Sequence, residues 1–440
     1  MKANVITEDY IRNLYYQANQ ARLAGDAELA IHLYLEHAKY MDIIPPHYYN
    51  TLGCLYNEKY MNISGNMSDI AASLKYFEKA SDIEPSNHLY AKNGTIMAMK
   101  FNNKEKGRKF WDRVFATGEL TNDDKYDYAA YCLKNKDFEG WYKYFGYRFK
   151  KETDGTIFPE IHGTEWTGEQ DLTGKTLLVM FEQGFGDTIL MFGYMERLTK
   201  LAKKVIFVLQ NNLVTLLENN EYGVEVYPFF KEEGSVKFDY YIPSMSIPIA
   251  LKVNEKTCGV GHGFIKVSEQ DIKDYAIILN KSIHNKNDIK IGLSVRGNLK
   301  GDRTRDIDVK DLKSLTNIKG ITFYNMTKDL DENSKRTMKR LMIEDISVSF
   351  KDFKDTAAAM MNMDAIVTTD NVLLNLAGAL GRKTFGLFNW SNQFRWFDLD
   401  GDNVVWLDTV KPFVCDKQND WSSPIKKVKK ELLKLRKVGH

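Results

Sequence analysis

A glycine turn that ends in an acid is the part of this sequence best suited to chemistry. Residues 182–188 read EQGFGDT, follow the apolar stretch 176–180 and precede an apolar-periodic stretch. This order predicts a strand, a turn and the start of a helix. Gly184 and Gly186 are expected to adopt dihedrals closed to other residues and to let a ligand approach the main chain, where free helix amides attract anionic or polar groups. Asp187 then either caps the helix or acts on a substrate.

A basic loop directly follows the predicted strand 289–295. Residues 296–305 contain two glycines and four cations: Arg296, Lys300, Arg303 and Arg305. Guanidinium groups pair with phosphate oxygens through two parallel hydrogen bonds, so these residues predict a pocket for a phosphate or diphosphate. The alternative is a solvated basic loop, and the position at the end of a strand favours the phosphate pocket.

Polar residues also end a third predicted strand. The run 364–371 ends in Thr369, Asp370 and Asn371, and a helix rich in small residues is expected to follow. Hydroxyl, carboxylate and amide groups here would bind a ribose or sugar, with the helix N-terminus behind a phosphate. The alternative for these side chains is helix capping, which is the better interpretation for Asp370 taken alone.

Short β-rich runs alternate with helices from about residue 151, which is typical of parallel sheets flanked by helices. The expected strands are 176–180, 205–209, 224–226, 289–295, 321–324, 366–369 and 384–388. A polar stretch at 280–288 separates two groups of strands, so we expect two α/β domains, 151–285 and 286–440, with a cleft between them. Ligands of such sheets lie beyond the carboxyl ends of the strands, where the glycine turn falls.

Residues 1–150 predict helical hairpins. Small and large residues alternate at helical spacing in a pattern that looks like a tetratricopeptide repeat. A second repeat carries a polar insert between its helices, residues 57–69, and two less regular repeats cover 91–115 and 126–149. We interpret the aromatic positions as packing between helices, and a stacked array of this kind also offers a groove for a partner or acceptor.

Composition narrows the classes of function. The chain has 440 residues, 43% of them apolar, and its 61 Lys and Arg balance 59 Asp and Glu, so no overall field favours nucleic acid or an anionic membrane. No uncharged apolar run reaches the roughly 18 residues of a membrane span, and the N-terminus lacks a signal-peptide pattern, so we expect a cytoplasmic protein. The cysteines are far apart and are expected to be reduced thiols that form neither a zinc site nor disulfides. They are Cys54, Cys132, Cys258 and Cys415.

Taken in this order, the three constellations resemble a known family, the bacterial tetratricopeptide-repeat proteins fused to a glycosyltransferase domain akin to the lipopolysaccharide heptosyltransferases. The resemblance covers nearly the whole chain. The glycine turn and the segment 376–381, LAGALG, are specific when they occur together at this separation. The further residues that carry it are Phe138, Glu139, Gly140, Trp141, Arg148, Trp166, Thr167, Gly168, Gly174, Lys175, Asp355, Thr356, Ala357, Asp364, Arg395, Trp396, Asp420 and Trp421.

The resemblance implies a glycosyltransferase-B architecture, in which two Rossmann-like domains face each other across a cleft. The nucleotide sugar, expected to be a UDP-sugar, is held mainly by the C-terminal domain, and no metal is needed because cations and a helix N-terminus neutralise the diphosphate. Asp187 matches the family's candidate general base. A base at this position takes the proton of the acceptor hydroxyl as the hydroxyl attacks the anomeric carbon, which gives inversion.

The resemblance also implies roles on the donor side. Arg303 and Arg305, with the other two cations of the loop in support, would stabilise charge on the leaving group. Asp370 and Asn371 would bind ribose or donor sugar. The chain departs from the family at Asn375, where a histidine is usual. Asparagine can still bind a phosphate or sugar but cannot carry a proton.

The acceptor is left open by the sequence. A repeat domain favours a protein or another macromolecular acceptor, while local basic faces also admit a hydroxymethylated base in DNA, exposed from the duplex. A basic amphipathic helix is expected at 425–437, and we interpret it as a helix that packs its leucines on a neighbour, the alternative being contact with DNA. A third hypothesis is a non-catalytic repeat scaffold that binds a nucleotide or a protein partner. Asn375 favours it, whereas the retained Asp187 and Asp370 speak against it.

Overall fold

The computed structural model describes residues 7–118, 120–151, 158–229, 236–281, 288–297, 303–328, 330–399 and 401–438, without the side chains of 303, 437 and 438. Contacts group the chain into two compact units, Met1–Asn135 and Lys136–His440, called here the helical unit and the two-sheet unit. The predicted boundary near residue 150 falls after α8 (Phe138–Tyr144) and the 3-10 helix η2 (Phe145–Phe149), which both belong to the two-sheet unit.

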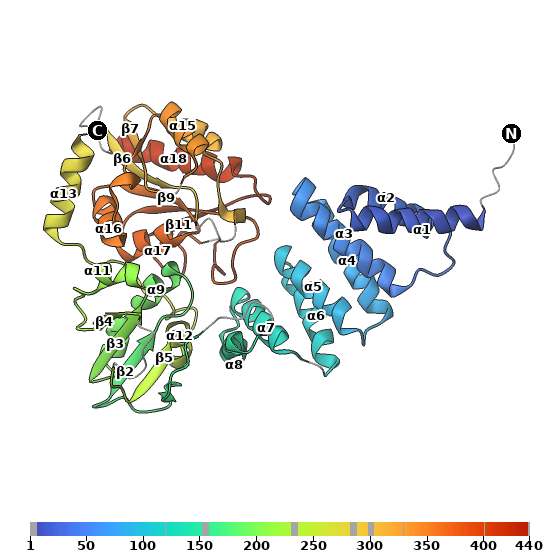
Figure 1. Ribbon diagram of the computed structural model, residues 1–440, viewed down its shortest axis with the longest axis horizontal. Helices are drawn as coiled ribbons and strands as arrows, with labels where there is room; N and C mark the ends of the chain where they lie inside the picture. The colour runs from blue at the N-terminus through green and yellow to red at the C-terminus, as the bar shows by residue number, and fades with distance from the viewer. Residues whose placement is uncertain are drawn as a thin grey trace. The chain divides into compact units, whose positions relative to one another are not determined.

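The helical unit is a series of hairpins (Figure 1). Its helices are α1 (Glu8–Leu23), α2 (Ala27–Ala38), α3 (Pro46–Lys59), α4 (Met67–Ile83), α5 (His88–Lys100), α6 (Lys104–Ala116) and α7 (Asn122–Lys134). Helices adjacent in sequence pack on each other from α1 through α6. Side-chain caps fix several helix starts: the Asp26 carboxylate accepts from the Leu29 amide at 3.0 Å, and Thr121 forms a capping box with Asp124. The packing is that of stacked hairpins, and the tetratricopeptide assignment stays a prediction.

The polar insert predicted at 57–69 is mostly helical. The helix α3 continues into a π-helical turn, η1 (Tyr60–Ser64), which ends at Gly65 in the left-handed region with a φ of 58°. Tyr60 is buried, so its ring holds the extra turn against the unit. The prediction of a separating insert was therefore wrong in conformation, because one buried aromatic among polar residues was enough to extend the helix.

Glycines set the spacing of the hairpins. A Cβ added to Gly94 of α5 would lie 2.2 Å from the ring of Phe110 on α6, and one added to Gly53 of α3 would lie 2.7 Å from the ring of Phe77 on α4. The two rings are buried. Each glycine thus permits a close approach of an aromatic ring that any side chain would obstruct.

The first sheet of the two-sheet unit is parallel and has five strands. They are β1 (Thr164–Glu165), β2 (Thr176–Met180), β3 (Lys204–Leu209), β4 (Glu225–Pro228) and β5 (Tyr240–Pro243), in the order β1-β5-β2-β3-β4. The accompanying helices are α9 (Phe185–Phe192), α10 (Met195–Thr199), η3 (Asn211–Leu213), α11 (Val214–Leu217), η4 (Ser244–Ser246) and α12 (Ile247–Ala250). The chain adds β3 and β4 on one side of β2 and then crosses to the other side to form β5. The carboxyl ends of β2 and β5 are therefore a topological switch point, where ligands of such sheets bind.

The second sheet is also parallel and has six strands. They are β6 (Ile289–Ser294), β7 (Ile321–Asn325), β8 (Ile343–Asp345), β9 (Ala365–Thr369), β10 (Thr384–Phe388) and β11 (Val410–Val414), in the order β11-β10-β9-β6-β7-β8. Its helices are α13 (Glu269–Asn280), η5 (Arg303–Arg305), η6 (Val309–Leu312), α14 (Lys313–Thr316), α15 (Glu332–Arg340), η7 (Ser347–Ser349), α16 (Phe353–Met361), α17 (Val372–Ala379) and α18 (Ser422–Val438). In this sheet the chain crosses from one side of β6 to the other to form β9, so the carboxyl ends of β6 and β9 are the second switch point.

Two parallel α/β domains are thus present, as predicted, and this architecture is consistent with the glycosyltransferase-B arrangement. The basic helix α18 buries Ile425, Val428 and Leu432 in the core of the second sheet, which confirms the packing interpretation. Helix α13 packs on α16, although it precedes the predicted domain boundary at 285.

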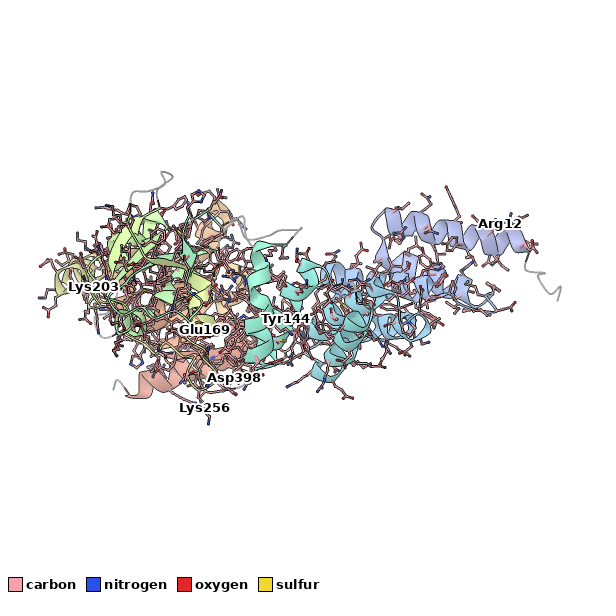
Figure 2. All side chains as sticks on the ribbon, turned by 90° about the horizontal axis from the view of Figure 1, so that it is seen from below. Arg12, Tyr144, Glu169, Lys203, Lys256 and Asp398 are labelled. Atoms are coloured by element: carbon pink, nitrogen blue, oxygen red, sulfur yellow. The ribbon has the colours of Figure 1, made fainter. Side chains whose placement is uncertain are left out.

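The surface of each unit is polar and charged. Arg12 of the helical unit and Lys203 and Lys256 of the two-sheet unit are exposed and project outward (Figure 2). None of the four cysteines, all of which lie in the described ranges, forms a disulfide. Across the described part of the chain, the helices are too short or too polar to cross a membrane.

We expect Gly94→Ala to destabilise the helical unit by about 1–3 kcal/mol, because the added methyl group overpacks against Phe110. Intrinsic helix propensity alone predicts the opposite, a gain of roughly 1 kcal/mol. Urea unfolding followed by circular dichroism measures the difference. Gly146→Ala is the control, since a Cβ at that position meets nothing within 4 Å. A stability gain for Gly94→Ala would contradict the packing argument.

Candidate functional site

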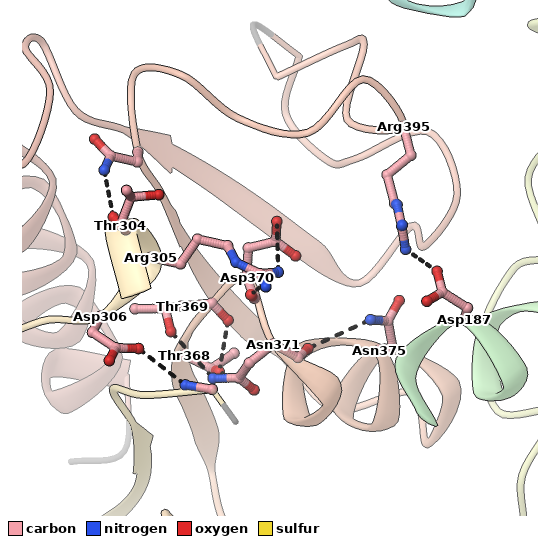
Figure 3. A network of polar contacts seen from close by, with 12 residues as sticks. Asp187, Thr304, Arg305, Asp306, Thr368, Thr369, Asp370, Asn371, Asn375 and Arg395 are labelled. Atoms are coloured by element: carbon pink, nitrogen blue, oxygen red, sulfur yellow. Dashed lines mark hydrogen bonds and ion pairs between the residues drawn. The ribbon is translucent and has the colours of Figure 1, made fainter. Parts of the chain in front are cut away.

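The two switch points of the two-sheet unit meet where α9 packs against α17. Helix α9 begins just after β2, and α17 begins just after β9. The contact is close, because a Cβ added to Gly186 would lie 2.8 Å from the Nδ2 of Asn375 and 3.4 Å from the Cα of Val372. The predicted glycine turn and the predicted third constellation are therefore neighbours in space (Figure 3).

Asp187 lies in the first turn of α9 and is 9% exposed. One carboxylate oxygen accepts from the Gly184 amide at 3.2 Å, and the other forms an ion pair with the Arg395 guanidinium. The two roles left open for Asp187 are thus compatible, because it caps its helix and also faces the other domain. Arg395 is part of the family pattern, but its ion pair with Asp187 was not predicted.

The turn before α9 is held in an unusual conformation at Gln183, with a φ of 82°, a region that favours glycine. The prediction that Gly184 and Gly186 adopt dihedrals closed to other residues is wrong, since Gly184 has a φ of −79° and Gly186 lies within α9. What Gly186 provides is the close approach to α17. The Gln210 side chain secures the turn, donating to the Gln183 carbonyl at 3.0 Å and accepting from the Thr188 hydroxyl at 2.9 Å.

A buried ion pair supports the same turn from behind. Arg148 of η2 is 1% exposed and donates to both carboxylate oxygens of Glu182 at 2.7 Å. Glu182 also accepts from the Met245 amide at 2.8 Å, and Arg148 donates to the Ser246 hydroxyl at 2.8 Å. The rings of Phe145 and Phe149 cover the guanidinium. These contacts explain why α8 and η2 belong to the two-sheet unit.

Two of the four predicted phosphate-binding cations have described side chains, and these two have different partners. Arg305 donates to the main-chain oxygen of Asp370 at 3.0 Å and lies 3.7 Å from its carboxylate. Arg296 instead pairs with Asp331 at 2.6 Å, at the start of α15, and this hydrogen bond holds the pKa of Asp331 well below its usual range. Lys300 and the side chain of Arg303 lie outside the described residues.

Asn371 is the cap of α17 and a link between strands. Its Oδ1 accepts from the Leu373 amide at 2.8 Å, and its Nδ2 donates to Ser294 and to Thr369, each at 3.1 Å. The side chain that caps α17 is therefore that of Asn371, and not that of Asp370, for which capping was the alternative interpretation. The side chains of Thr369 and Asn371 already hold the carboxyl ends of β6 and β9 together, and their binding of a sugar stays a prediction.

Asn375 lies on the first turns of α17, beside Gly186, and is 5% exposed. Its Nδ2 donates to the main-chain oxygen of Asn371 at 3.4 Å. Among the residues that the structure describes, its buried Oδ1 has no hydrogen-bond partner. Within the described ranges, no three His, Cys, Asp or Glu residues lie together as metal ligands would.

We expect Arg148→Leu to lower the free energy of unfolding by about 3–5 kcal/mol, because it leaves the Glu182 carboxylate buried without a counter-charge. The double variant Arg148→Leu, Glu182→Leu should recover part of this loss, since apolar replacement of a whole buried pair is often neutral. Chemical unfolding of the full chain measures both. Lys204→Leu breaks the exposed pair with Glu225 and should cost less than about 1 kcal/mol. Equal losses at the two sites would contradict the role given to the buried pair.

Comparison with known proteins finds no matching family model. The curated protein FlbA from Caulobacter vibrioides is 24% identical over 313 residues, which cover 66% of this chain and 51% of FlbA. The chain thus spans about half the length of this curated relative.

Several solved structures are also similar. A family 9 glycosyl transferase from Veillonella parvula shares 14% identity at a TM-score of 0.45, over 61% of this chain and 91% of that one. The ADP-heptose lipopolysaccharide heptosyltransferase II of E. coli shares 12% at 0.43, over 59% and 98%. A mutant O-GlcNAc transferase from Thermobaculum terrenum shares 11% at 0.33, over 98% and 92%. A TM-score below 0.5 does not by itself establish a shared fold.

Proposed function

We propose that this protein is an inverting glycosyltransferase that moves a sugar from a nucleotide sugar to a hydroxyl group of a macromolecule. The observation that carries the proposal is the meeting of two switch points at the α9–α17 contact. One supplies the Asp187 carboxylate, and the other supplies Asp370, Arg305 and the N-terminus of α17. A general base thus lies near a place suited to a diphosphate.

The proposed reaction is a single displacement. The acceptor oxygen attacks the anomeric carbon, and its proton passes to the Asp187 carboxylate as the bond from that carbon to the diphosphate oxygen breaks. The nucleoside diphosphate leaves with the electron pair of that bond. Because the acceptor enters on the face opposite the leaving group, the configuration at the anomeric carbon inverts. The Arg395 guanidinium beside Asp187 orients the carboxylate before the acceptor arrives.

In this proposal, positively charged and polar groups of the protein stabilise the negative charge of the leaving diphosphate. Arg305 lies at the carboxyl end of β9, and the amides of α17 carry the positive end of the helix dipole. This arrangement supports metal-independent transfer from a nucleoside diphosphate sugar, with a UDP-sugar as the first donor to test.

We propose a protein as the acceptor. Two cations of α18, a candidate DNA-binding face, contact the protein's own groups: Lys429 donates to the Ser314 carbonyl at 2.6 Å and Arg436 to the Lys319 carbonyl at 3.1 Å. The helical unit exposes aromatic side chains, among them Tyr10 and Tyr16, which suit contacts with another protein. Retained transfer to a hydroxymethylated DNA oligonucleotide, with none to protein, would reverse this choice.

We expect Asp187→Asn to slow catalysis about 10²–10⁴-fold while nucleotide-sugar binding persists, because the amide keeps the shape of the carboxylate but cannot accept the proton. Release of nucleoside diphosphate from UDP-, ADP- and GDP-sugars, with water as a slow acceptor, measures the rate. Glu169→Gln makes the same chemical change at an exposed acid that pairs with Lys252, and should leave the rate unchanged. A wild-type rate in Asp187→Asn would contradict the proposed base.

We expect Arg305→Ala to weaken the binding of the donor's nucleoside diphosphate by roughly 10-fold or more, because a charged hydrogen bond to phosphate contributes about 1.5–3 kcal/mol. Calorimetric titration and ligand-induced melting shifts with UDP, ADP and GDP measure the effect. Arg305→Lys keeps the charge and should lose less. Lys203→Ala, at an exposed position, is the control. Equal affinity in wild type and Arg305→Ala would remove Arg305 from the phosphate site.

A further inference from the structure

The side-chain oxygen of Asn375 is a buried hydrogen-bond acceptor that the described protein groups leave unmatched. An unmatched buried polar group costs about 1–3 kcal/mol, so folded proteins rarely keep one unless water or a ligand matches it. Asn375 lies at the contact of α9 and α17, one residue away from Asp187 across Gly186. The side chain therefore lies against the helix that carries Asp187.

The orientation of the Asn375 amide follows from its neighbour. The main-chain oxygen of Asn371 can only accept, so the Nδ2 of Asn375 must face it, at 3.4 Å. The Oδ1 is consequently turned away from Asn371. Figure 3 shows this oxygen on the side of Asp187 and Arg395. The position thus turns an unmatched acceptor toward the side of the proposed base.

The proposed reaction fixes which part of the substrate lies in that space. The anomeric carbon is bonded to the diphosphate and is attacked by the hydroxyl that Asp187 deprotonates, so the sugar must lie between the two. Asn375 belongs to α17, whose N-terminus is proposed to face the diphosphate, and it also touches the helix of Asp187. Its oxygen thus adjoins the transferred sugar more closely than the nucleotide.

We propose that Asn375 selects the donor sugar by accepting a hydrogen bond from a hydroxyl or amide N–H group of that sugar. The inference rests on the proposed function and deepens it, because it assigns the chemical class of the sugar.

Asn375→Leu tests the inference, since it keeps the branching at Cγ and removes the acceptor. Calorimetric titration of the full chain compares UDP-glucose, ADP-glucose and GDP-mannose with UDP, ADP and GDP. We expect affinity for the nucleotide sugar to fall about tenfold and affinity for the free diphosphate to stay unchanged. The melting temperature without ligand should be unchanged or higher, because an unmatched buried oxygen is removed. Asn362→Leu, at the opposite edge of the sheet before β9, is the matched control.

Deoxyglucose derivatives of UDP provide a second measurement. One of the 2-, 3-, 4- and 6-deoxy forms should bind wild type about tenfold more weakly than UDP-glucose, yet bind Asn375→Leu as well as UDP-glucose does. Asn375→Ser replaces the leucine variant in both measurements if that variant does not fold. Equal losses for sugar and diphosphate, or equal sensitivity of both proteins to every deoxy form, would overturn the inference. A wild-type chain that binds no nucleotide of the panel would instead overturn the proposed function.

Discussion

A buried ion pair between Arg148 and Glu182 is the constraint on which the site depends. Two charges removed from water must match each other closely, and here the guanidinium forks onto both carboxylate oxygens while two aromatic rings cover it. Glu182 comes directly before Gln183, whose left-handed backbone opens the turn to Asp187. Strain of that kind persists only where the surroundings determine it fully, and the ion pair provides this on one side of the turn.

The same helical segment also reaches the second domain of the two-sheet unit. Lys136, just before α8, pairs with Glu255 at 2.7 Å and with Asp398 at 3.3 Å. The ring of Phe145 contacts that of Phe394, next to Arg395. One short segment therefore supports the turn that carries Asp187 and the loop that carries Arg395, and these two side chains form an ion pair. The parts of the site that belong to different domains share a common support.

Sequence patterns predicted the sheets well where a strand is a buried apolar run, as in β2 and β10. They missed β1, β5, β8 and β11, which are short or contain tyrosine, proline or charged residues. The polar residues at strand ends were found because parallel strands gather their carboxyl ends at one edge. The partners of these polar residues were not predicted, because Arg395 lies 208 positions from Asp187 and spacing along the sequence does not reveal such a contact. The residue types around Gln183 do not indicate its left-handed backbone conformation.

The contact of α9 with α17, made through Gly186, joins the two α/β domains at the candidate site. In a rigid rotation, points near the axis move least and points far from it move most. A rotation of the two domains about this contact would therefore move their outer edges most, while Asp187 and Asn375 would keep their mutual position. The geometry at the contact would then be insensitive to how far the domains open.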